Sequence, residues 1–206
     1  MLMKNKYPNQ LFHLAFITGE EILGKSGFNA ILNYAKLQKF IGNYPPGNME
    51  LEHPSEDYTR FMASIIDVMG EKGARALLFR GGVRAFEISL EQFPALFNLN
   101  GIEPEKKAPE EMFDEFKRIY QIIVNASNSM YGDIYRLYDC DEGVTLEMSP
   151  CLYCNKIKSE KPVCFIQVGY QHGLTRWVLG QPAKVEEVEC IATGDDKCKI
   201  IVHRPK

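Results

Sequence analysis

A cysteine-bearing run near the C-terminus, residues 163–202, constrains the fold of this chain more than any other stretch. It holds Cys164, Cys190 and Cys198. Glu187 stands three residues before Cys190. Three thiolates and one carboxylate form a four-coordinate ligand set of the kind that zinc accepts. Such a set has to be assembled from separate elements, so its residues fix how those elements pack.

The local pattern predicts that a β-hairpin brings two of these cysteines together. Residues 184–191 and 197–202 are β-type runs, and the turn-forming sequence Thr-Gly-Asp-Asp lies between them. Antiparallel pairing across so short a loop places Cys190 close to Cys198. Glu187 lies an odd number of residues from Cys190, on the opposite face of a regular strand. A bulge or the strand entry therefore has to turn Glu187 toward the site.

Cysteine spacing by itself leaves the metal assignment open. Generic zinc motifs pair their ligands as C-x-x-C, a spacing that this four-residue set lacks. Buried free cysteines also commonly behave as small apolar residues. The residue types therefore permit a zinc site here without requiring one.

A wider pattern in the same run resembles a known family. The pattern consists of Cys164, Gly169-Tyr170, Gly173, Gly180-x-Pro182, Glu187-x-x-Cys190, Gly194 and Cys198. It resembles the 4-vinyl reductase, or hydrocarbon-binding, domain. That family is similar to the sensory N-terminal domains of bacterial regulators that respond to phenols and other aromatic compounds.

The resemblance implies a structural zinc, because three cysteines and a glutamate hold one in those sensory domains in the same order along the chain. Carried over residue by residue, the zinc ligands are Cys164, Glu187, Cys190 and Cys198. The resemblance also implies the ligand-binding fold of nitric-oxide-signalling and Golgi-transport proteins, which include TRAPP-like adaptor subunits. Relatives commonly pair through their N-terminal helices, so a homodimer is expected.

A second cysteine pair, Cys151 and Cys154, has the C-x-x-C spacing. Such a pair is half of a zinc site or a redox dithiol, although the βαβ pattern around a thioredoxin-like pair is absent. In a competing metal assignment the pair joins Cys190 and Cys198 in an all-cysteine site. The resemblance favours the first ligand set and leaves the C-x-x-C pair as a free or regulatory dithiol, or as two partly buried thiols.

Composition describes an ordinary globular chain. Its 206 residues suffice for one well-filled domain and are short for two. A formal net charge of −3 gives no electrostatic footprint for direct nucleic-acid binding. No apolar run approaches the roughly 20 residues that span a bilayer, and the N-terminus lacks the apolar core of a signal peptide. A cytoplasmic protein with reduced thiols is therefore expected.

The order of periodic patterns predicts one α+β domain over residues 1–206, with N-terminal helices packed on a short antiparallel sheet. An extended lead-in is expected over residues 1–18. A mainly helical part with the dimer interface and the pocket is expected over residues 19–130. Residues 131–206 predict a β-meander of four strands, interrupted by one helix and carrying the zinc site.

Glycines inside the helical patterns predict close packing between helices. The pair Gly81-Gly82 costs a helix roughly 1–2 kcal/mol relative to alanine, so it is expected where another element approaches. Gly169 and Gly173 lie four residues apart, on one face of a helix expected over residues 164–179. Both sites predict backbones in close contact.

The chain shows no motif of an enzyme. A Ser-His-Asp set, a carboxylate dyad and a dinucleotide fingerprint are all missing from the sequence, and its four histidines are scattered. A zinc filled by four protein ligands is structural, because catalytic zinc needs an open position. An aromatic content of 11% suits a mostly apolar cavity with a few polar groups. We therefore predict a sensor or carrier domain for a hydrophobic, aromatic or hydrocarbon-like small molecule.

Aromatic residues and one histidine are the candidate ligand-binding residues, and each is also a candidate for the ordinary core. They are Phe79, Phe86, Phe97, Phe165, Tyr170 and Trp177, with His172 as a hydrogen-bonding group. The sequence has no DNA-binding helix or ATPase motif. Any signalling output is therefore expected from a downstream regulatory protein or from rearrangement of the dimer.

Two other functional classes stay open. The family name implies an enzyme or an accessory factor for reducing a tetrapyrrole vinyl group, yet no flavin or nicotinamide motif is present. The other class is a TRAPP-like interaction adaptor whose groove binds protein or an acyl chain. A reactive cysteine at the pocket mouth would favour the adaptor, and Cys140 is the thiol without another assignment.

Overall fold

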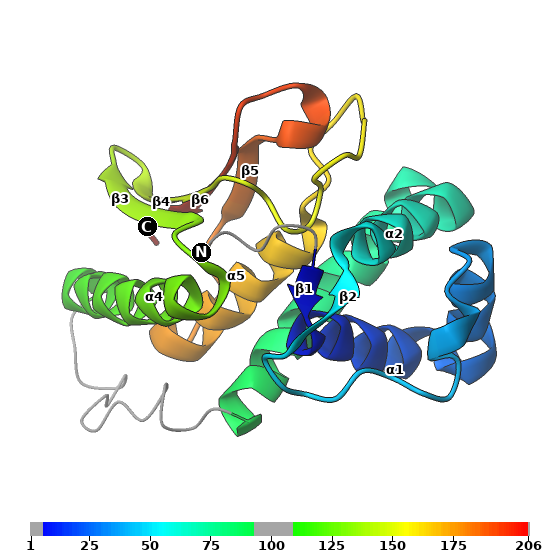
Figure 1. Ribbon diagram of the computed structural model, residues 1–206. Coiled ribbons are helices and arrows are strands. Elements are labelled where there is room, and N and C mark those ends of the chain that lie inside the picture. The colour runs from blue at the N-terminus through cyan, green and yellow to red at the C-terminus, as the bar shows by residue number, and fades with distance from the viewer. Residues whose placement is uncertain (1–5, 93–108, 206) are drawn as a thin grey trace.

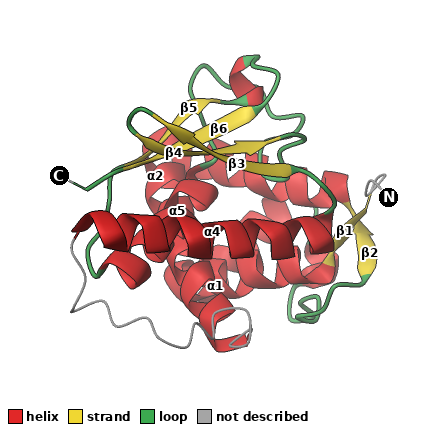
Figure 2. Ribbon diagram, turned by 90° about the vertical axis from the view of Figure 1, so that its left-hand side faces the viewer, coloured by secondary structure: helices red, strands yellow, loops and turns green. Residues whose placement is uncertain are grey.

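The structure is a computed structural model that describes residues 6–92 and 109–205, with helices packed beneath an antiparallel sheet (Figure 1, Figure 2). The helices are α1 (Asn9–Tyr34), α2 (Ser55–Gln92), α4 (Pro109–Tyr131) and α5 (Phe165–Leu179). The strands are β1 (Lys6–Pro8), β2 (Leu51–Pro54), β3 (Tyr135–Cys140), β4 (Gly143–Met148), β5 (Val185–Glu189) and β6 (Cys198–His203). Short 3-10 helices span Gln38–Phe40 and Ile191–Thr193. This arrangement confirms the predicted α+β class.

The larger sheet has the order β3-β4-β6-β5, with antiparallel pairing throughout, and β1 and β2 form a separate ribbon. The predicted meander is therefore wrong in one respect, because β4 pairs with β6 rather than with β5. Strand β6 buries Cys198, Ile200 and Val202 on one face, so it occupies an interior position. Strand β5 has the sequence VEEVE, whose carboxylates suit the edge of a sheet.

The predicted hairpin is present, and it contains the irregularity that Glu187 requires. Strands β5 and β6 pair antiparallel, and the register shifts between Glu187 and Glu189. Beyond the strand, Cys190 precedes the 3-10 helix that leads to β6. The shift breaks the strict alternation of faces, so Glu187 and Cys190 reach the same site.

Helix α1 begins at Asn9, within the segment predicted as an extended lead-in, so that prediction is wrong from this residue on. The reason is that the helix buries polar residues, which break the apolar periodicity. The Asn9 side chain donates hydrogen bonds to Asn48 (3.0 Å) and Glu52 (2.7 Å). The Gln10 side chain donates to Gln92 (2.9 Å). Buried polar groups of this kind are tolerated because they are paired.

Both long helices bend at a glycine. Gly24 interrupts α1 with φ 70° and ψ 160°, and Gly70 interrupts α2 with φ 66° and ψ 167°. Positive φ with extended ψ is a conformation that glycine adopts at little cost. The predicted breaks in the helical pattern are thus confirmed. Among the described residues, no helix combines the length and the apolarity needed to cross a membrane.

Helices α2 and α5 cross with their backbones in contact, as the glycines predicted. A Cβ atom on Gly82 would lie 2.0 Å from the carbonyl oxygen of Ile166. A Cβ atom on Gly169 would lie 2.0 Å from the carbonyl oxygen of Phe79. Only glycine fits at either position, and the close crossing fixes α5 against α2.

Much of the aromatic content fills a core between α1 and α2. The Phe16 ring packs edge-on against Phe28 (5.6 Å between centroids) and Phe61 (5.0 Å). Phe12 and Phe40 extend this cluster, and all five rings are buried. Aromatic composition alone therefore does not identify a ligand cavity in this chain.

Candidate functional site

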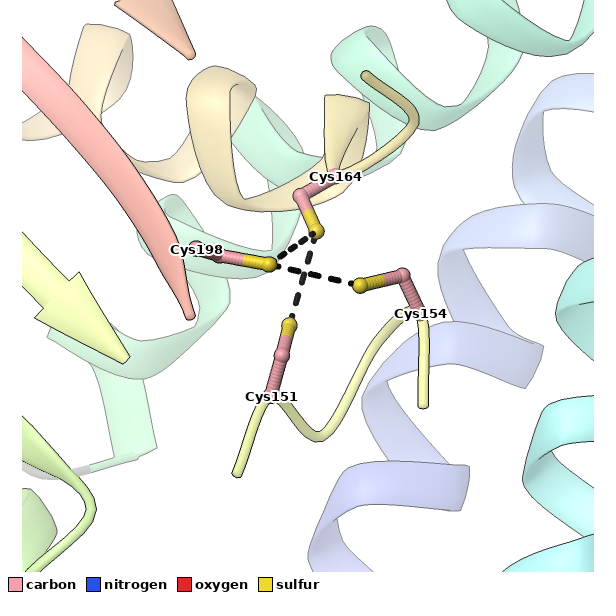
Figure 3. Close-up of side chains that lie close together, drawn as sticks. All are labelled: Cys151, Cys154, Cys164 and Cys198. Atoms are coloured by element: carbon pink, nitrogen blue, oxygen red, sulfur yellow. Dashed lines mark hydrogen bonds between the residues drawn. The ribbon is translucent and has the colours of Figure 1, made fainter. Parts of the chain in front are cut away.

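Five buried cysteines gather where the loop after β4, the start of α5 and the β5–β6 hairpin meet. Figure 3 shows Cys151 and Cys154 of that loop pointing toward Cys164 and Cys198. Cys164 is the residue immediately before α5, and Cys198 is the first residue of β6. Cys190 lies between β5 and the following 3-10 helix. All five side chains have 0% exposure.

The sulfur atoms lie at the separations of ligands that share one ion. The Sγ atoms of Cys151 and Cys164 are 3.4 Å apart, as are those of Cys154 and Cys198. The Sγ atoms of Cys164 and Cys198 are 3.8 Å apart. The same distance, 3.8 Å, separates the Sγ atoms of Cys154 and Cys190. These contacts link all five thiols into one cluster.

Two sets of four donors in this cluster can hold a metal ion, and in each set the donor atoms lie within 4.8 Å of one another. One set is Cys164, Glu187, Cys190 and Cys198, the set predicted from the sequence. The other is Cys151, Cys154, Cys164 and Cys198. Cys164 and Cys198 belong to both sets. The structure thus brings the C-x-x-C pair into the cluster from which the preferred interpretation had excluded it.

Glu187 is held at the cluster by a backbone hydrogen bond. Its Oε2 atom accepts from the amide N–H of Cys164 at 2.8 Å. Its buried Oε1 atom has no hydrogen-bond partner among the described residues. Burial raises the pKa of Glu187 to about 9, and the neighbouring Cys190 thiol adds to the effect. A cation would stabilise the carboxylate and reverse this shift, so Oε1 is oriented as a metal ligand would be.

The thiols alter one another's protonation. Contact with the Cys154 thiol lowers the pKa of Cys190 to about 6, and contact with Cys151 lowers that of Cys198 to about 6. The Cys151 thiol raises the pKa of Cys164 well above its usual value. Cys198 Sγ also accepts a hydrogen bond from the amide N–H of Ile191 at 3.3 Å. The cluster therefore already favours thiolate at two positions, and thiolate is the form that binds metal.

A cavity of about 110 Å³ adjoins the cluster. Helices α1, α2, α4 and α5, strands β3 and β4, and the C-x-x-C loop all contribute to its wall. Tyrosines dominate the lining: Tyr58, Tyr120, Tyr131, Tyr135, Tyr153 and Tyr170. Apolar side chains such as Leu11, Ile123 and Ile166 complete the wall. The cavity is thus an apolar container with several hydroxyl groups.

Four polar atoms in the cavity wall are buried and have no hydrogen-bond partner within the described part of the chain. They are the hydroxyl oxygens of Tyr58 and Tyr120 and the Oε1 atoms of Gln10 and Gln171. Buried polar atoms are almost always paired, because an unpaired one costs about 1–3 kcal/mol. A ligand that offers a donor and an acceptor at this place would satisfy them.

Of the candidate ligand-binding residues predicted from the sequence, Tyr170 lines this cavity. Its neighbour Phe86 packs against the Tyr170 ring at 5.3 Å from behind the lining. The other described candidates lie elsewhere. Phe79 packs on His172 (5.1 Å), Trp177 packs on Phe86 (6.1 Å) and is 37% exposed, and Arg75 lies over the Phe165 ring (6.0 Å). Phe97 lies outside the described residues.

The sequence reasoning missed the residues that carry the unpaired polar atoms. Gln10 fell in the segment interpreted as a lead-in, and Tyr58 and Tyr120 were assigned only to the apolar faces of helices. Gln171 lies between Gly169 and Gly173, on the buried side of α5. A polar residue on a buried helix face was the available indication. Cys140, at the end of β3, is half-buried and belongs to neither metal-binding set.

The part of the chain that holds the cluster matches a known family. Residues 144–204 match the model of the 4-vinyl reductase (4VR) domain. The chain carries a 4VR domain. The resemblance predicted from the cysteine and glycine pattern is therefore confirmed over this part. Its relation to TRAPP-like adaptors stays a prediction.

Two relatives match short stretches of this 4VR-domain protein. An uncharacterised protein of Methanocaldococcus jannaschii is 32% identical over 60 residues, which make up 29% of this chain and 33% of that protein. The phenol regulator MopR of Acinetobacter guillouiae is 40% identical over 43 residues, which make up 21% of this chain and 8% of MopR. The chain thus matches a third or less of either relative's length.

The fold likeness extends beyond the 4VR domain to the N-terminal helices. An oxygen-binding H-NOX domain related to soluble guanylate cyclases is similar with a TM-score of 0.58, at 14% identity over 96% of both chains. An identity this low shows the fold alone. It confirms the predicted ligand-binding fold and the arrangement of the helices around the cavity.

Proposed function

We propose that this sensor-like domain binds a single-ring aromatic compound that carries a polar group, such as a phenol. The observation that carries the proposal is the set of four unpaired, buried polar atoms in the wall of an otherwise apolar cavity. A phenolic hydroxyl both donates and accepts. It can donate to the Oε1 atom of Gln10 or Gln171 and accept from the hydroxyl of Tyr58 or Tyr120.

The cavity volume supports a ligand of this size. About 110 Å³ is of the same order as the ~150 Å³ engineered cavity that holds one benzene ring. The match to a phenol regulator supports the same ligand class. Haem is associated with the H-NOX family, but a four-ring macrocycle does not fit a cavity of this volume. A haem-based role is therefore not part of the proposal.

The cysteine cluster is proposed to hold one structural zinc ion. The donor set fits zinc, because thiolate sulfur with one carboxylate oxygen is a combination that it accepts. Cys164, Glu187, Cys190 and Cys198 would hold the ion and join the start of α5 to the β5–β6 hairpin. A centre closed by four protein ligands contributes to folding rather than to catalysis.

Ligand binding is tested by thermal unfolding with phenol and with toluene, which has a similar ring but no hydroxyl. At about 100 times its dissociation constant, phenol should stabilise the protein by about 2.7 kcal/mol, which raises the melting temperature by about 5–10 °C. At equal concentration toluene should give a smaller shift, because it leaves the polar atoms unpaired. Equal shifts would remove the argument from these atoms.

Variants of the cavity tyrosines locate the binding. The Tyr58→Phe/Tyr120→Phe double variant keeps both rings and removes both unpaired hydroxyls. We expect it to weaken phenol binding by about fivefold or more, the equivalent of about 1 kcal/mol per hydrogen bond, and to change toluene binding little. Tyr138→Phe is the control, because Tyr138 is 41% exposed and lies outside the cavity lining. Unchanged phenol affinity in the double variant would contradict this site.

The homodimer, the downstream regulatory protein and the vinyl-reduction role stay predictions from the family resemblance. Within the described residues, the cavity and the cluster fit a binding domain, and a second function has no specific observation in its favour.

A further inference from the structure

The C-x-x-C pair lies inside the cysteine cluster although the ligand pattern implied by the family resemblance does not require it. Cys151 lies 3.4 Å from Cys164 and Cys154 lies 3.4 Å from Cys198, measured between Sγ atoms. Both thiols are fully buried. Thiols placed only for packing would have no reason to surround the two cysteines that both metal-binding sets share. Their position indicates a role at the metal centre.

The four sulfur atoms of Cys151, Cys154, Cys164 and Cys198 have the spacing of a zinc tetrahedron. A zinc–sulfur distance of about 2.3 Å places two sulfurs of one tetrahedral ion about 3.8 Å apart. The distances that join these four thiols are 3.4, 3.4 and 3.8 Å. The all-cysteine set is therefore as well formed as the set that contains Glu187.

The two sets overlap too closely to hold two ions at once. Two zinc ions that shared Cys164 and Cys198 as bridges would direct their remaining ligands away from each other, to separations of about 6 Å. Cys154 and Cys190, which come from different sets, are only 3.8 Å apart. That distance is the one expected for ligands of a single ion. The cluster thus offers six donors to one position.

We propose that Cys151 and Cys154 are a second, exchangeable ligand pair for this ion. Cys164 and Cys198 ligate it in both states, and the remaining two positions are taken either by Glu187 with Cys190 or by Cys151 with Cys154. The exchange breaks two metal–ligand bonds and forms two, so it needs no oxidant or reductant. In one state the ion secures the bulged end of β5, and in the other it secures the loop between β4 and α5.

The inference rests on the proposed metal binding and is tested by removing one ligand pair at a time. We expect one zinc ion per chain in the wild type by native mass spectrometry. The Cys151→Ser/Cys154→Ser variant and the Glu187→Gln/Cys190→Ser variant should each retain one ion, because the other pair takes over. The Cys164→Ser/Cys198→Ser variant should lose the ion. Cys140→Ser, at the thiol outside the cluster, is the control and should bind like the wild type.

Cobalt(II) substitution identifies the ligands in each variant. Sulfur-to-cobalt charge-transfer absorption grows with the number of thiolates. We therefore expect stronger absorption per ion in Glu187→Gln/Cys190→Ser, which has four thiolates, than in Cys151→Ser/Cys154→Ser, which has three. Should a variant fail to fold, alkylation of the wild type serves instead. Bound metal should slow the reaction of Cys151 and Cys154, and equal rates with and without metal would contradict the proposal.

Three outcomes overturn the inference. Loss of the ion in Glu187→Gln/Cys190→Ser, with retention in Cys151→Ser/Cys154→Ser, would show that the C-x-x-C pair is not a ligand. Two ions in the wild type would show a bridged centre instead of exchange. A wild type that binds no metal would defeat the proposed zinc site itself, which is a different failure from loss in one variant.

Discussion

At the scale of single residues, the fold depends on two glycines that allow α2 and α5 to touch. The Cβ positions of Gly82 and Gly169 coincide with backbone atoms of the opposite helix, at 2.0 Å in each case. A backbone carbonyl cannot move aside as a flexible side chain can. Gly81, next in sequence to Gly82, faces a different environment. Its Cβ would lie 3.6 Å from Thr18 Oγ1, which is an ordinary contact.

This difference predicts opposite effects of the same substitution at adjacent positions. Gly82→Ala should destabilise the protein by at least about 1–3 kcal/mol, because the helices have to separate to admit the methyl group. Gly81→Ala should stabilise it by up to about 1 kcal/mol, since alanine is the better helix former and has room. Chemical denaturation of the two variants measures both values. Similar effects at the two positions would show that the helices do not cross as described.

At the scale of elements, one loop and one helix end join the metal centre to the cavity. Tyr153 lies between Cys151 and Cys154 in sequence, lines the cavity and is hydrogen-bonded to Tyr135. On the other side, Gln167 follows Cys164 by less than one helical turn and also lines the cavity. Ligation of the cysteines therefore fixes the position of two wall segments.

This connection predicts that metal and ligand affect each other's affinity. Removing zinc with a chelator, or substituting Cys151→Ser/Cys154→Ser, should weaken phenol binding by about fivefold or more, because Tyr153 is no longer held in the wall. The coupling is reciprocal, so phenol should raise the affinity for zinc by the same factor as zinc raises that for phenol. Calorimetric titration with and without metal measures it. Equal phenol affinities in the two states would mean that the two sites are independent.

The local elements were predictable from the sequence, whereas their long-range arrangement was not. Helical periodicity and glycine placement identified α5 and its contact with α2, and the turn sequence identified the β5–β6 hairpin with its bulge near Glu187. The pairing of β4 with β6 depends on contacts between distant residues, which a local pattern does not record. The approach of Cys151 and Cys154 to Cys164 is of the same kind. A C-x-x-C spacing describes the pair and not its neighbours in space.

At the scale of the whole molecule, the chain divides its two tasks between its halves. The 4VR domain covers residues 144–204, which carry all five clustered cysteines. Much of the cavity wall comes from α1, α2 and α4, which lie outside that domain match. The family pattern therefore identified the metal ligands and left the ligand-binding residues undetermined. Within the described residues, the unpaired polar atoms of Tyr58 and Tyr120 belong to this N-terminal part.

The central claim is that a phenol-like ring occupies this cavity and pairs with its orphaned polar atoms. A crystal structure of the protein with phenol tests it most directly. We predict the ring among the cavity tyrosines, with its hydroxyl within hydrogen-bonding distance of Gln171 Oε1 or the Tyr120 hydroxyl. A cavity that holds only ordered water at saturating phenol, or a ring bound elsewhere with these atoms still unpaired, would contradict the account.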